Sequence, residues 1–366
     1  MSEAAPLETE IRRRIAAAGP MPVDQYMALC LGDPDHGYYT TRDPLGRGGD
    51  FITAPEISQM FGELIGLWVT ALWKQMGSPA QVRMVELGPG RGTLMKDAMR
   101  AAQVVPGFRE AVSIHLVEIS PVLEELQERT LEPLSTPMAW HPSLSDVPDG
   151  PSIVVANEFF DALPIKQAIK GENGWHERQV GIAADGKLAF MMSADPIPYF
   201  DRLLPEAVRA APKSSIFEWR ADTAAFDLGK RVADSGGAAL VIDYGHIASA
   251  AGDTFQAVGR HAYADPLLAP GSVDLTAHVD FQALIRAAEA MGARGFGPII
   301  QSRFLRRLGI ETRATTLKTK ASRAVSSEID AALARLIGHG RTGMGELFKV
   351  AAFAHPSIGT PAGFEL

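Results

Sequence analysis

The stretch VRMVELGPGRGT, residues 82–93, carries the feature from which the architecture of this 366-residue chain can be inferred. Its first half, residues 82–87, is a short apolar run typical of a buried strand, and it leads directly into glycines at positions 88, 90 and 92. Glycine in such a turn supplies positive φ angles and lets the backbone approach a ligand closely. Because residues 93–102 then favour a helix, the order predicts a ligand site at the carboxyl end of a central strand.

The spacing of the glycines narrows the choice of ligand. Dinucleotide-binding loops have the pattern G-x-G-x-x-G with the pyrophosphate at the helix N-terminus, whereas this loop has G-x-G-x-G. Glu86 stands two positions before the first glycine, and a carboxylate there repels a pyrophosphate but attracts a cationic ligand. A nicotinamide enzyme is therefore the least favoured interpretation. A tight turn that needs only small residues is the structural alternative.

Strands and helices alternate along the chain around this loop. The pattern predicts further strands at residues 113–119, 138–141, 152–157 and 238–244. It predicts helices at residues 121–130, 222–234 and 281–291. Two late segments, 293–297 and 346–355, suit an antiparallel final pair, and 166–192 suits a strand pair around Asp185-Gly186. Such alternation predicts an α/β fold, with crossover connections on a parallel sheet and helices on both faces.

The first 77 residues depart from this pattern and are predicted to form an N-terminal helical extension with a lid loop, ahead of a core over 78–366. Leu7, Ile11 and Ile15 recur at helical spacing. Two further helices are expected over residues 23–31 and 56–76. Residues 33–56 are dense in Gly, Pro and Asp, and so long a loop in a compact domain is usually functional or disordered.

Composition and charge exclude several classes of protein. Hydrophobic residues make up 46% of the chain and charged residues 21%, which is ordinary for a globular protein and excludes a disordered one. The net charge is −8, from 43 Asp and Glu against 35 Lys and Arg, so there is no global attraction to nucleic acid or to an anionic membrane.

The single cysteine, Cys30, excludes an internal disulfide and a cysteine-based metal cage, and it suits a reducing compartment. No pair of histidines has metal-ligand spacing with a third donor nearby, so no metal is predicted. The longest apolar stretch, 64–73, is too short to span a bilayer, and no membrane insertion is expected. Because the acidic N-terminus lacks the features of a targeting signal, a cytoplasmic location is expected.

Glu86, the glycine loop and a second acid, Glu118, together resemble the class I S-adenosylmethionine-dependent methyltransferases. Glu118 ends the next strand, where a carboxylate can accept hydrogen bonds from both ribose hydroxyls. The resemblance implies a Rossmann-type, mostly parallel seven-stranded sheet with helices on both faces. It also implies that Glu86 and the loop face the methionine end of the cofactor while Glu118 holds the ribose. The residues expected to bind S-adenosyl-L-methionine are Glu86, Gly88, Pro89, Gly90, Gly92, Glu118, Ile119, Asn157 and Thr53.

The sequence ANEFFDALP, residues 156–164, follows the fourth strand, and the same resemblance places it beside the reactive methyl group. Methyltransferases of amino groups on bases carry Asn or Asp, then Pro-Pro and an aromatic residue at this tip, and this sequence departs from that pattern after Asn157. Glu158 and Asp161 suggest a guanidinium acceptor, whose five N–H donors match carboxylates. Its pKa above ~12 calls for orientation rather than simple deprotonation. Two alternatives stay open: Glu158 faces solvent, and Asp161 caps the next turn.

Six segments look like the MidA family, which contains the mitochondrial complex I assembly methyltransferase and its bacterial relatives. They are GDFITAPEISQMFGELIG (49–66), HGYY (36–39), ANEFFDALP (156–164), IDYGH (242–246), DLTAHVDF (274–281) and MGELFKV (344–350). The resemblance implies an N-terminal helical extension and late insertions, at about 166–220, 246–280 and 298–343. Residues 254–260 and 298–302 depart from the family pattern, which affects the acceptor surface rather than the cofactor site.

The family resemblance also implies a reaction. It is the symmetric dimethylation of an arginine, with the quinone-site (49-kDa-type) subunit of NADH:quinone oxidoreductase as the matching protein substrate, in support of complex I assembly. In DLTAHVDF, His278 is placed to touch the acceptor. The predicted catalytic residues are therefore Glu158, Asp161 and His278.

The segment GDFITAPE, residues 49–56, has two interpretations. As a lid over the glycine loop it would bring Thr53 and Glu56 near the cofactor and exclude water from the transfer step. As a structural plug it would fill the space between the N-terminal helices and the core.

Other functions stay open as well. A cofactor-binding assembly chaperone needs the same pocket, and so does a methyltransferase for another protein, an RNA or a small molecule. The negative charge and the lack of a basic stretch interleaved with aromatic residues count against RNA. The sequence does not indicate which arginine is modified, how many methyl groups are added, or the oligomeric state.

Overall fold

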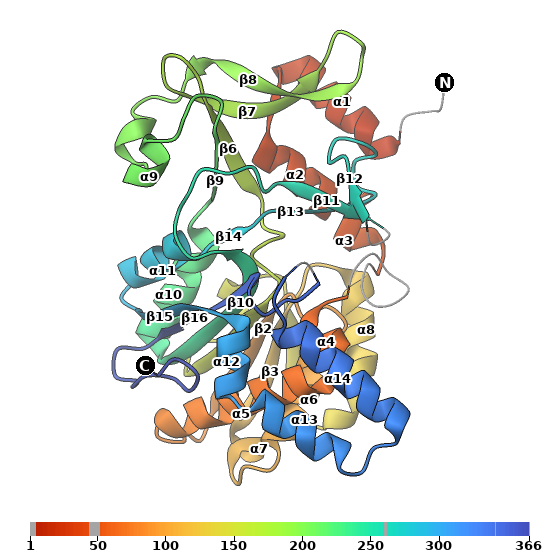
Figure 1. Cartoon of the computed structure of the whole chain (residues 1–366), viewed down its shortest axis with the longest axis vertical. Helices are drawn as coiled ribbons and strands as arrows, with labels where there is room; N and C mark the ends of the chain where they lie inside the picture. The colour runs from red at the N-terminus through yellow and green to blue at the C-terminus, as the bar shows by residue number, and fades with distance from the viewer. Residues whose placement is uncertain (1–4, 44–51, 260–261, 341, 366) are drawn as a thin grey trace. The chain divides into compact units, whose positions relative to one another are not determined.

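The structure is a computed structural model that describes residues 5–43, 52–259, 262–340 and 342–365. Figure 1 shows its helices and strands in chain order. They form two compact units, each assembled from three separate stretches of the chain. The first unit comprises Met1–Phe51, Asp161–Ala221 and Ala248–Asp280. The second comprises Ile52–Phe160, Asp222–Ile247 and Phe281–Leu366.

The second unit is built on a mostly parallel sheet. Its strands are β2 (Val82–Leu87), β3 (Val112–Val117), β4 (Met138–His141), β5 (Ser152–Asn157), β10 (Gly237–His246), β15 (Arg294–Ile300) and β16 (Phe348–Ala354). They lie in the order β15-β16-β10-β5-β2-β3-β4. The neighbours from β10 to β4 pair in parallel, whereas β16 runs antiparallel to both β10 and β15. The mostly parallel sheet and the antiparallel final pair are as predicted from the sequence.

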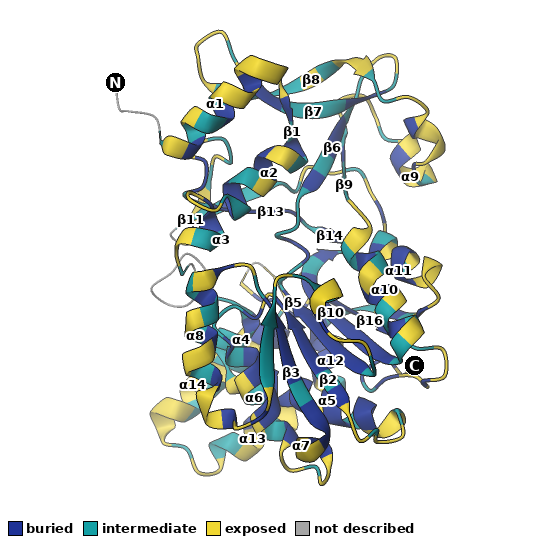
Figure 2. Ribbon diagram, turned by 180° about the vertical axis from the view of Figure 1, so that it is seen from behind, coloured by how far each residue is buried: buried dark blue, intermediate teal, exposed yellow. Residues whose placement is uncertain are grey.

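Helices cover this sheet because its strands are apolar on both faces. Every residue of β5 is buried, and the strands of this sheet have the dark blue of buried residues in Figure 2. The helices of the second unit are α4 (Ala54–Ile57), α5 (Gln59–Gln75), α6 (Thr93–Ala102), α7 (Phe108–Ala111), α8 (Pro121–Leu131), α10 (Thr223–Ser235), α11 (Phe281–Ala290), α12 (Gln301–Arg307), α13 (Ile310–Lys318) and α14 (Arg323–Ile337). Two short 3₁₀ helices, Glu132–Leu134 and Leu144–Asp146, complete it. Helices α10 and α11 pack against β10 and β16.

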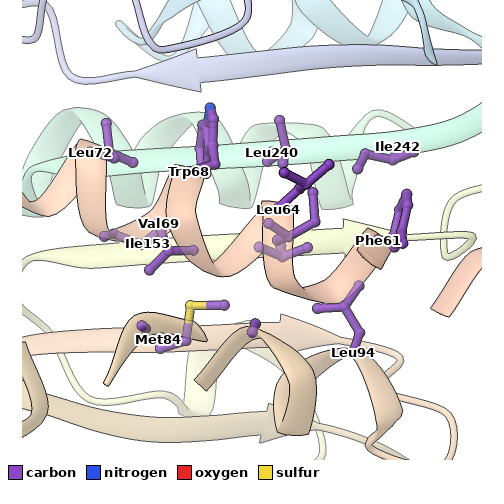
Figure 3. Close-up of a cluster of buried hydrophobic side chains, with 14 of the residues drawn as sticks. Phe61, Leu64, Trp68, Val69, Leu72, Met84, Leu94, Ile153, Leu240 and Ile242 are labelled. Carbon is purple, nitrogen blue, oxygen red and sulfur yellow. The ribbon is translucent and has the colours of Figure 1, made fainter. Parts of the chain in front are cut away.

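Helix α5 supplies much of the core of the second unit. Its residues Phe61, Leu64 and Trp68 pack over Ile153 of β5 and Leu240 of β10 (Figure 3). The helix predicted over 56–76 is interrupted, because the residue at position 58 is extended and its hydroxyl caps α5. The preceding turn is a separate short helix, α4.

The first unit contains two antiparallel sheets. In the larger, β1 (Met21–Pro22), β7 (Trp175–Ile182), β6 (Ile165–Lys170) and β9 (Ile216–Arg220) lie in that order, and β8 (Leu188–Pro196) pairs with β7. The β7–β8 hairpin is the strand pair predicted around Asp185-Gly186. In the smaller, β11 (Gln256–Gly259) lies between β12 (Ala262–Ala264) and β13 (Asp274–Thr276). The other elements are β14 (Val279–Asp280), α1 (Pro6–Ala18), α2 (Val23–Gly32), α3 (Tyr38–Thr41), α9 (Glu206–Arg209) and the 3₁₀ helix Phe200–Arg202.

The N-terminal helices share one core with two later parts of the chain. Ile11 of α1 and Cys30 of α2 are completely buried with Ile165 of β6, Val180 of β7 and Leu275 of β13. The predicted insertions 166–220 and 246–280 correspond closely to the two later stretches of the first unit. The predicted domain boundary at residue 77 falls inside the second unit, just after α5. Among the described residues, no helix has the length and apolar character needed to cross a membrane.

Candidate active site

The loop between β2 and α6 holds three glycines in the left-handed region. Their φ angles are 61° at Gly88, 55° at Gly90 and 79° at Gly92. The N–H of Gly88 donates to the carbonyl of Val117 at 3.0 Å, which ties the loop to the neighbouring strand β3. A Cβ atom on Gly88 would lie 3.0 Å from the ring of Phe159. Both the backbone conformation and the space around it therefore require glycine here.

Glu86 is a buried carboxyl group beside this loop. Its side chain is 3% exposed, and its Oε2 has no hydrogen-bond partner among the described residues. Burial raises the pKa of Glu86 to about 8, and the hydrogen bond from the backbone N–H of Met95 opposes this only in part. A cation next to Oε2 would lower the pKa and occupy the vacant acceptor. The group therefore fits a positively charged ligand.

Glu118 lies at the tip of β3 with its carboxylate held in place. Oε1 accepts the backbone N–H groups of Ile119 at 2.9 Å and Ser120 at 2.8 Å, and Oε2 accepts Nε2 of Gln127 at 3.0 Å. Burial raises the pKa of Glu118, and these three hydrogen bonds lower it. The neighbouring Ile119 is 62% exposed, so it offers an apolar surface on which a flat base can pack. This pair suits a nucleoside.

Gln127 of α8 connects the glycine loop to Glu118, and the sequence analysis missed it. Its side chain is completely buried. Nε2 donates to the carbonyl of Gly90 at 2.8 Å as well as to Glu118, and Oε1 accepts the indole N–H of Trp140 at 2.9 Å. The signal that could have found it is a glutamine one helical turn after Leu123, on the face of α8 that is otherwise apolar.

The tip of β5 places Asn157 and Glu158. Glu158 has φ of 51°, a left-handed conformation that is uncommon outside glycine. Its N–H donates to the carbonyl of Ile242 in β10, and its Oε1 accepts the N–H of Ala54 at 2.9 Å and Nδ2 of Asn157 at 3.2 Å. The Oδ1 of Asn157 is buried and has no hydrogen-bond partner in the described part of the chain. The carboxylate of Glu158 is therefore held in a defined orientation.

The segment that precedes α5 lies beside both of these features. Ala54 follows Thr53, and its N–H is the donor to Glu158. The carboxylate of Glu56 accepts the hydroxyl of Thr93, the first residue of α6 after the glycine loop. This arrangement is the one that the lid interpretation requires of Glu56. The beginning of the predicted lid, residues 49–51, lies outside the described residues.

Asp161 and His278 belong to the first unit, where Arg220 of β9 joins their backbones. Arg220 donates from Nη2 to the carbonyl of Asp161 at 3.1 Å and from Nη1 to that of His278 at 2.8 Å. The N–H of Ala277 also donates to the carbonyl of Asp161, and the N–H of His278 donates to Oγ1 of Thr254. Two predicted catalytic residues are thus brought together there, whereas Glu158 and the predicted cofactor residues belong to the second unit.

Glu218, two residues before Arg220 on β9, holds the other end of the same region. Its carboxylate accepts the N–H groups of Thr254 and Phe255, both at 3.0 Å, and the hydroxyl of Thr254. Residues two apart on a strand face the same way, so β9 presents an acceptor and a donor side by side. The pair fixes the course of the chain toward His278.

The donor set of the second unit fits S-adenosyl-L-methionine. A sulfonium and an ammonium group suit the buried carboxyl of Glu86, the ribose suits Glu118 and the adenine suits Ile119. Within the described residues, no group of three or more histidine, cysteine and acidic side chains could hold a metal ion.

Comparison with known proteins agrees with this fit. Residues 64–299 match a family described as "Putative S-adenosyl-L-methionine-dependent methyltransferase". A crystal structure of a COG1565 superfamily member from Burkholderia thailandensis, bound to S-adenosyl-homocysteine, superimposes with a TM-score of 0.84 at 29% identity, over 98% of this chain and 93% of that one.

Curated relatives have similar sequences over most of their length. The chain is 39% identical to "Protein arginine methyltransferase NDUFAF7 homolog, mitochondrial" of Drosophila melanogaster, over 86% of this chain and 77% of the relative. It is 38% identical to "Protein arginine methyltransferase NDUFAF7, mitochondrial" of Danio rerio, over 92% and 84%, and 39% identical to that of Homo sapiens, over 87% and 76%. The chain therefore belongs to this family of S-adenosyl-L-methionine-dependent methyltransferases, with the α/β methyltransferase fold predicted from its sequence.

Proposed function

We propose that this methyltransferase modifies an arginine of a protein, and that its substrate is the quinone-site (49-kDa-type) subunit of NADH:quinone oxidoreductase. The observation that carries the arginine assignment is the carboxylate of Glu158, fixed at the tip of β5 by Ala54 and Asn157. A guanidinium offers planar N–H donors that match such a carboxylate. The names of the NDUFAF7 relatives support an arginine substrate, and symmetric dimethylation and the choice of subunit rest on the family resemblance alone.

Each residue of the second unit has a proposed task. Bound S-adenosyl-L-methionine supplies an electrophilic methyl group on a positively charged sulfur. Glu86 and the glycine loop hold its methionine end, and Glu118 accepts hydrogen bonds from its ribose. Glu158 accepts N–H groups of the arginine and turns one nitrogen toward the transferred carbon. Its positive φ is a strained conformation of the kind that persists where a fixed side-chain direction serves function.

The remaining assignments rest on the sequence. We propose Thr53, Asn157 and Ile119 as cofactor contacts, and Asp161 and His278 as residues that act on the acceptor. We also propose a cytoplasmic location, supported by the single cysteine.

The substrate is tested by labelling. Purified enzyme and isotopically methyl-labelled S-adenosyl-L-methionine are added to a lysate from a strain that lacks this gene, and mass spectrometry locates the label. We expect dimethylated arginine on the quinone-site subunit. Label on another protein would reject the subunit, and no label despite measurable cofactor binding would favour an assembly chaperone.

The role of Glu158 is tested by Glu158→Gln. The amide carbonyl can still accept the N–H of Ala54, so the fold and the affinity for S-adenosyl-homocysteine should stay within about twofold of wild type. Because the negative charge is lost, kcat should fall by about a hundredfold or more. Turnover is measured with the labelled substrate, and binding by calorimetry.

The matched control is Glu128→Gln, which removes an exposed carboxylate from α8. It should leave kcat and the affinity for S-adenosyl-homocysteine unchanged. A Glu158→Gln enzyme with the kcat of wild type would contradict the proposed role.

A further inference from the structure

Gln127 has a side-chain orientation that its surroundings determine completely. Both hydrogens of its amide nitrogen are used, one by the carbonyl of Gly90 and one by the carboxylate of Glu118, and its oxygen accepts the indole N–H of Trp140. A flipped amide would set its oxygen against two acceptors and its nitrogen against a donor. Because the side chain is completely buried, water cannot replace any of these partners.

The two acceptors of this amide belong to different parts of the predicted cofactor site. Gly90 lies in the loop after β2, and Glu118 at the tip of β3. Gln127 itself comes from α8, so its hydrogen bonds fix the loop, the strand tip and the helix relative to one another. A ligand that contacts both Gly90 and Glu118 then meets partners that are already in place, which lowers the entropic cost of binding.

The amide also acts on the charge of Glu118. A donated hydrogen bond favours the ionised carboxylate, which is the form that accepts from hydroxyl groups with both oxygens. The other titratable group that acts on Glu118 is Glu124, in the first turn of α8, and its charge works in the opposite direction. With one hydrogen bond from Gln127 on Oε2, an acceptor position on that oxygen remains for a ribose hydroxyl.

We infer that Gln127 is a positioning residue for the cofactor, which holds the glycine loop and the ribose-binding carboxylate of Glu118 in one geometry and keeps that carboxylate ionised. The inference rests on the role of Glu118 proposed above. Gln127 contacts no part of the cofactor itself in this assignment.

Gln127→Glu tests this with almost no change in shape. One of the two donors becomes an acceptor, so at pH 8 a second negative charge faces Glu118 and the carbonyl of Gly90. We expect the Kd for S-adenosyl-homocysteine, measured by calorimetry, to rise by about tenfold or more at pH 8. Near pH 6 the two carboxyl groups can share one proton, which restores a donor, so the affinity should recover.

Wild type should have the opposite pH dependence. Its affinity should fall toward low pH as Glu118 becomes protonated, so the two curves have slopes of opposite sign. A loss of packing alone would weaken binding equally at every pH. A Kd within twofold of wild type throughout, or a loss that does not vary with pH, would overturn the inference.

Two further variants keep the result interpretable. Gln127→Met has a similar volume and no donor, and it should weaken binding at all pH values even if Gln127→Glu folds poorly. Gln103→Glu adds a charge at an exposed position of the second unit and should bind like wild type. Glu118→Ala separates the two claims: if it binds S-adenosyl-homocysteine like wild type, the ribose assignment fails. If it binds weakly while Gln127→Glu does not, only the role of Gln127 fails.

Discussion

Glu86 shows at the scale of one residue how the cofactor site is poised at the expense of stability. In the unfolded chain its pKa is close to 4.5, and burial raises it to about 8 in the folded protein. The folded state therefore binds more protons between these two values, and stability falls as pH rises through that window. The slope is at most about 1.4 kcal/mol per pH unit.

Glu86→Gln should remove this dependence. The amide stays neutral at every pH, so the variant without ligand should have a higher Tm than wild type at pH 8 and a similar Tm at pH 5. Thermal unfolding at several pH values measures the difference. Equal Tm differences at pH 5 and pH 8 would show that Glu86 does not titrate in this window.

Residues of the site differ in how visible they are in the sequence. Glu86 and the glycines are recognisable because their chemistry depends on spacing within one short stretch. Gln127 is not, because its partners Gly90 and Trp140 come together only when β2, β4 and α8 are assembled. The bond between Glu158 and Ala54 is invisible for the same reason, since 104 residues separate them.

At the scale of elements, the position of the glycine loop depends on how closely α5 and α6 pack. Gly62 and Gly66 lie one turn apart on α5, and a Cβ atom on Gly66 would lie 2.1 Å from the carbonyl oxygen of Ala98 in α6. That atom belongs to the backbone of α6, so only a shift of the helix can relieve the clash. Because α6 begins directly after the loop, such a shift moves the loop as well.

Gly66→Ala should therefore destabilise the protein although alanine favours helices. Overpacking costs about 1–3 kcal/mol and outweighs a gain in helix propensity of about 1 kcal/mol. We expect a lower Tm and weaker binding of S-adenosyl-homocysteine. Gly32→Ala is the control, since nothing lies within 4 Å of a Cβ atom there, and its Tm should be equal or slightly higher. A Gly66→Ala protein as stable as wild type would refute this packing argument.

Most elements were predictable because their signals are local. The strand over 82–87 and the helix over 93–102 have the bounds that apolar runs and glycines indicate. The helix predicted over 56–76 was not interrupted in the prediction, since the extended backbone at Ser58 reflects the contacts of the preceding turn and not the periodicity of the helix. The close approach of Gly66 to α6 likewise has no signature in the sequence.

At the scale of the whole molecule, the grouping of distant segments could not be read from the sequence. Periodicity predicts that Leu7 and Ile11 have a buried side on a helix, but not which segment covers them. In the structure they share a core with Leu275, which lies more than 260 residues away. The prediction of a self-contained N-terminal extension therefore differs from the first unit, in which that extension and two later stretches bury one another.

The only cysteine of the chain reports on this shared core. Cys30 is completely buried, and burial raises the pKa of its thiol to about 12, so it should react slowly with a thiol reagent in the folded protein. Leu275, from a different stretch of the first unit, is buried in the same cluster. Truncating a buried leucine costs about 2–5 kcal/mol, and opening of one cooperative unit then becomes about thirtyfold or more frequent. Leu275→Ala should therefore speed the labelling of Cys30 by at least that factor, measured by absorbance at pH 8. Leu268→Ala, at a position of the same stretch that is 68% exposed, should leave the rate unchanged. An unchanged rate in Leu275→Ala would mean that the N-terminal helices fold as a unit of their own, as the sequence pattern alone suggests.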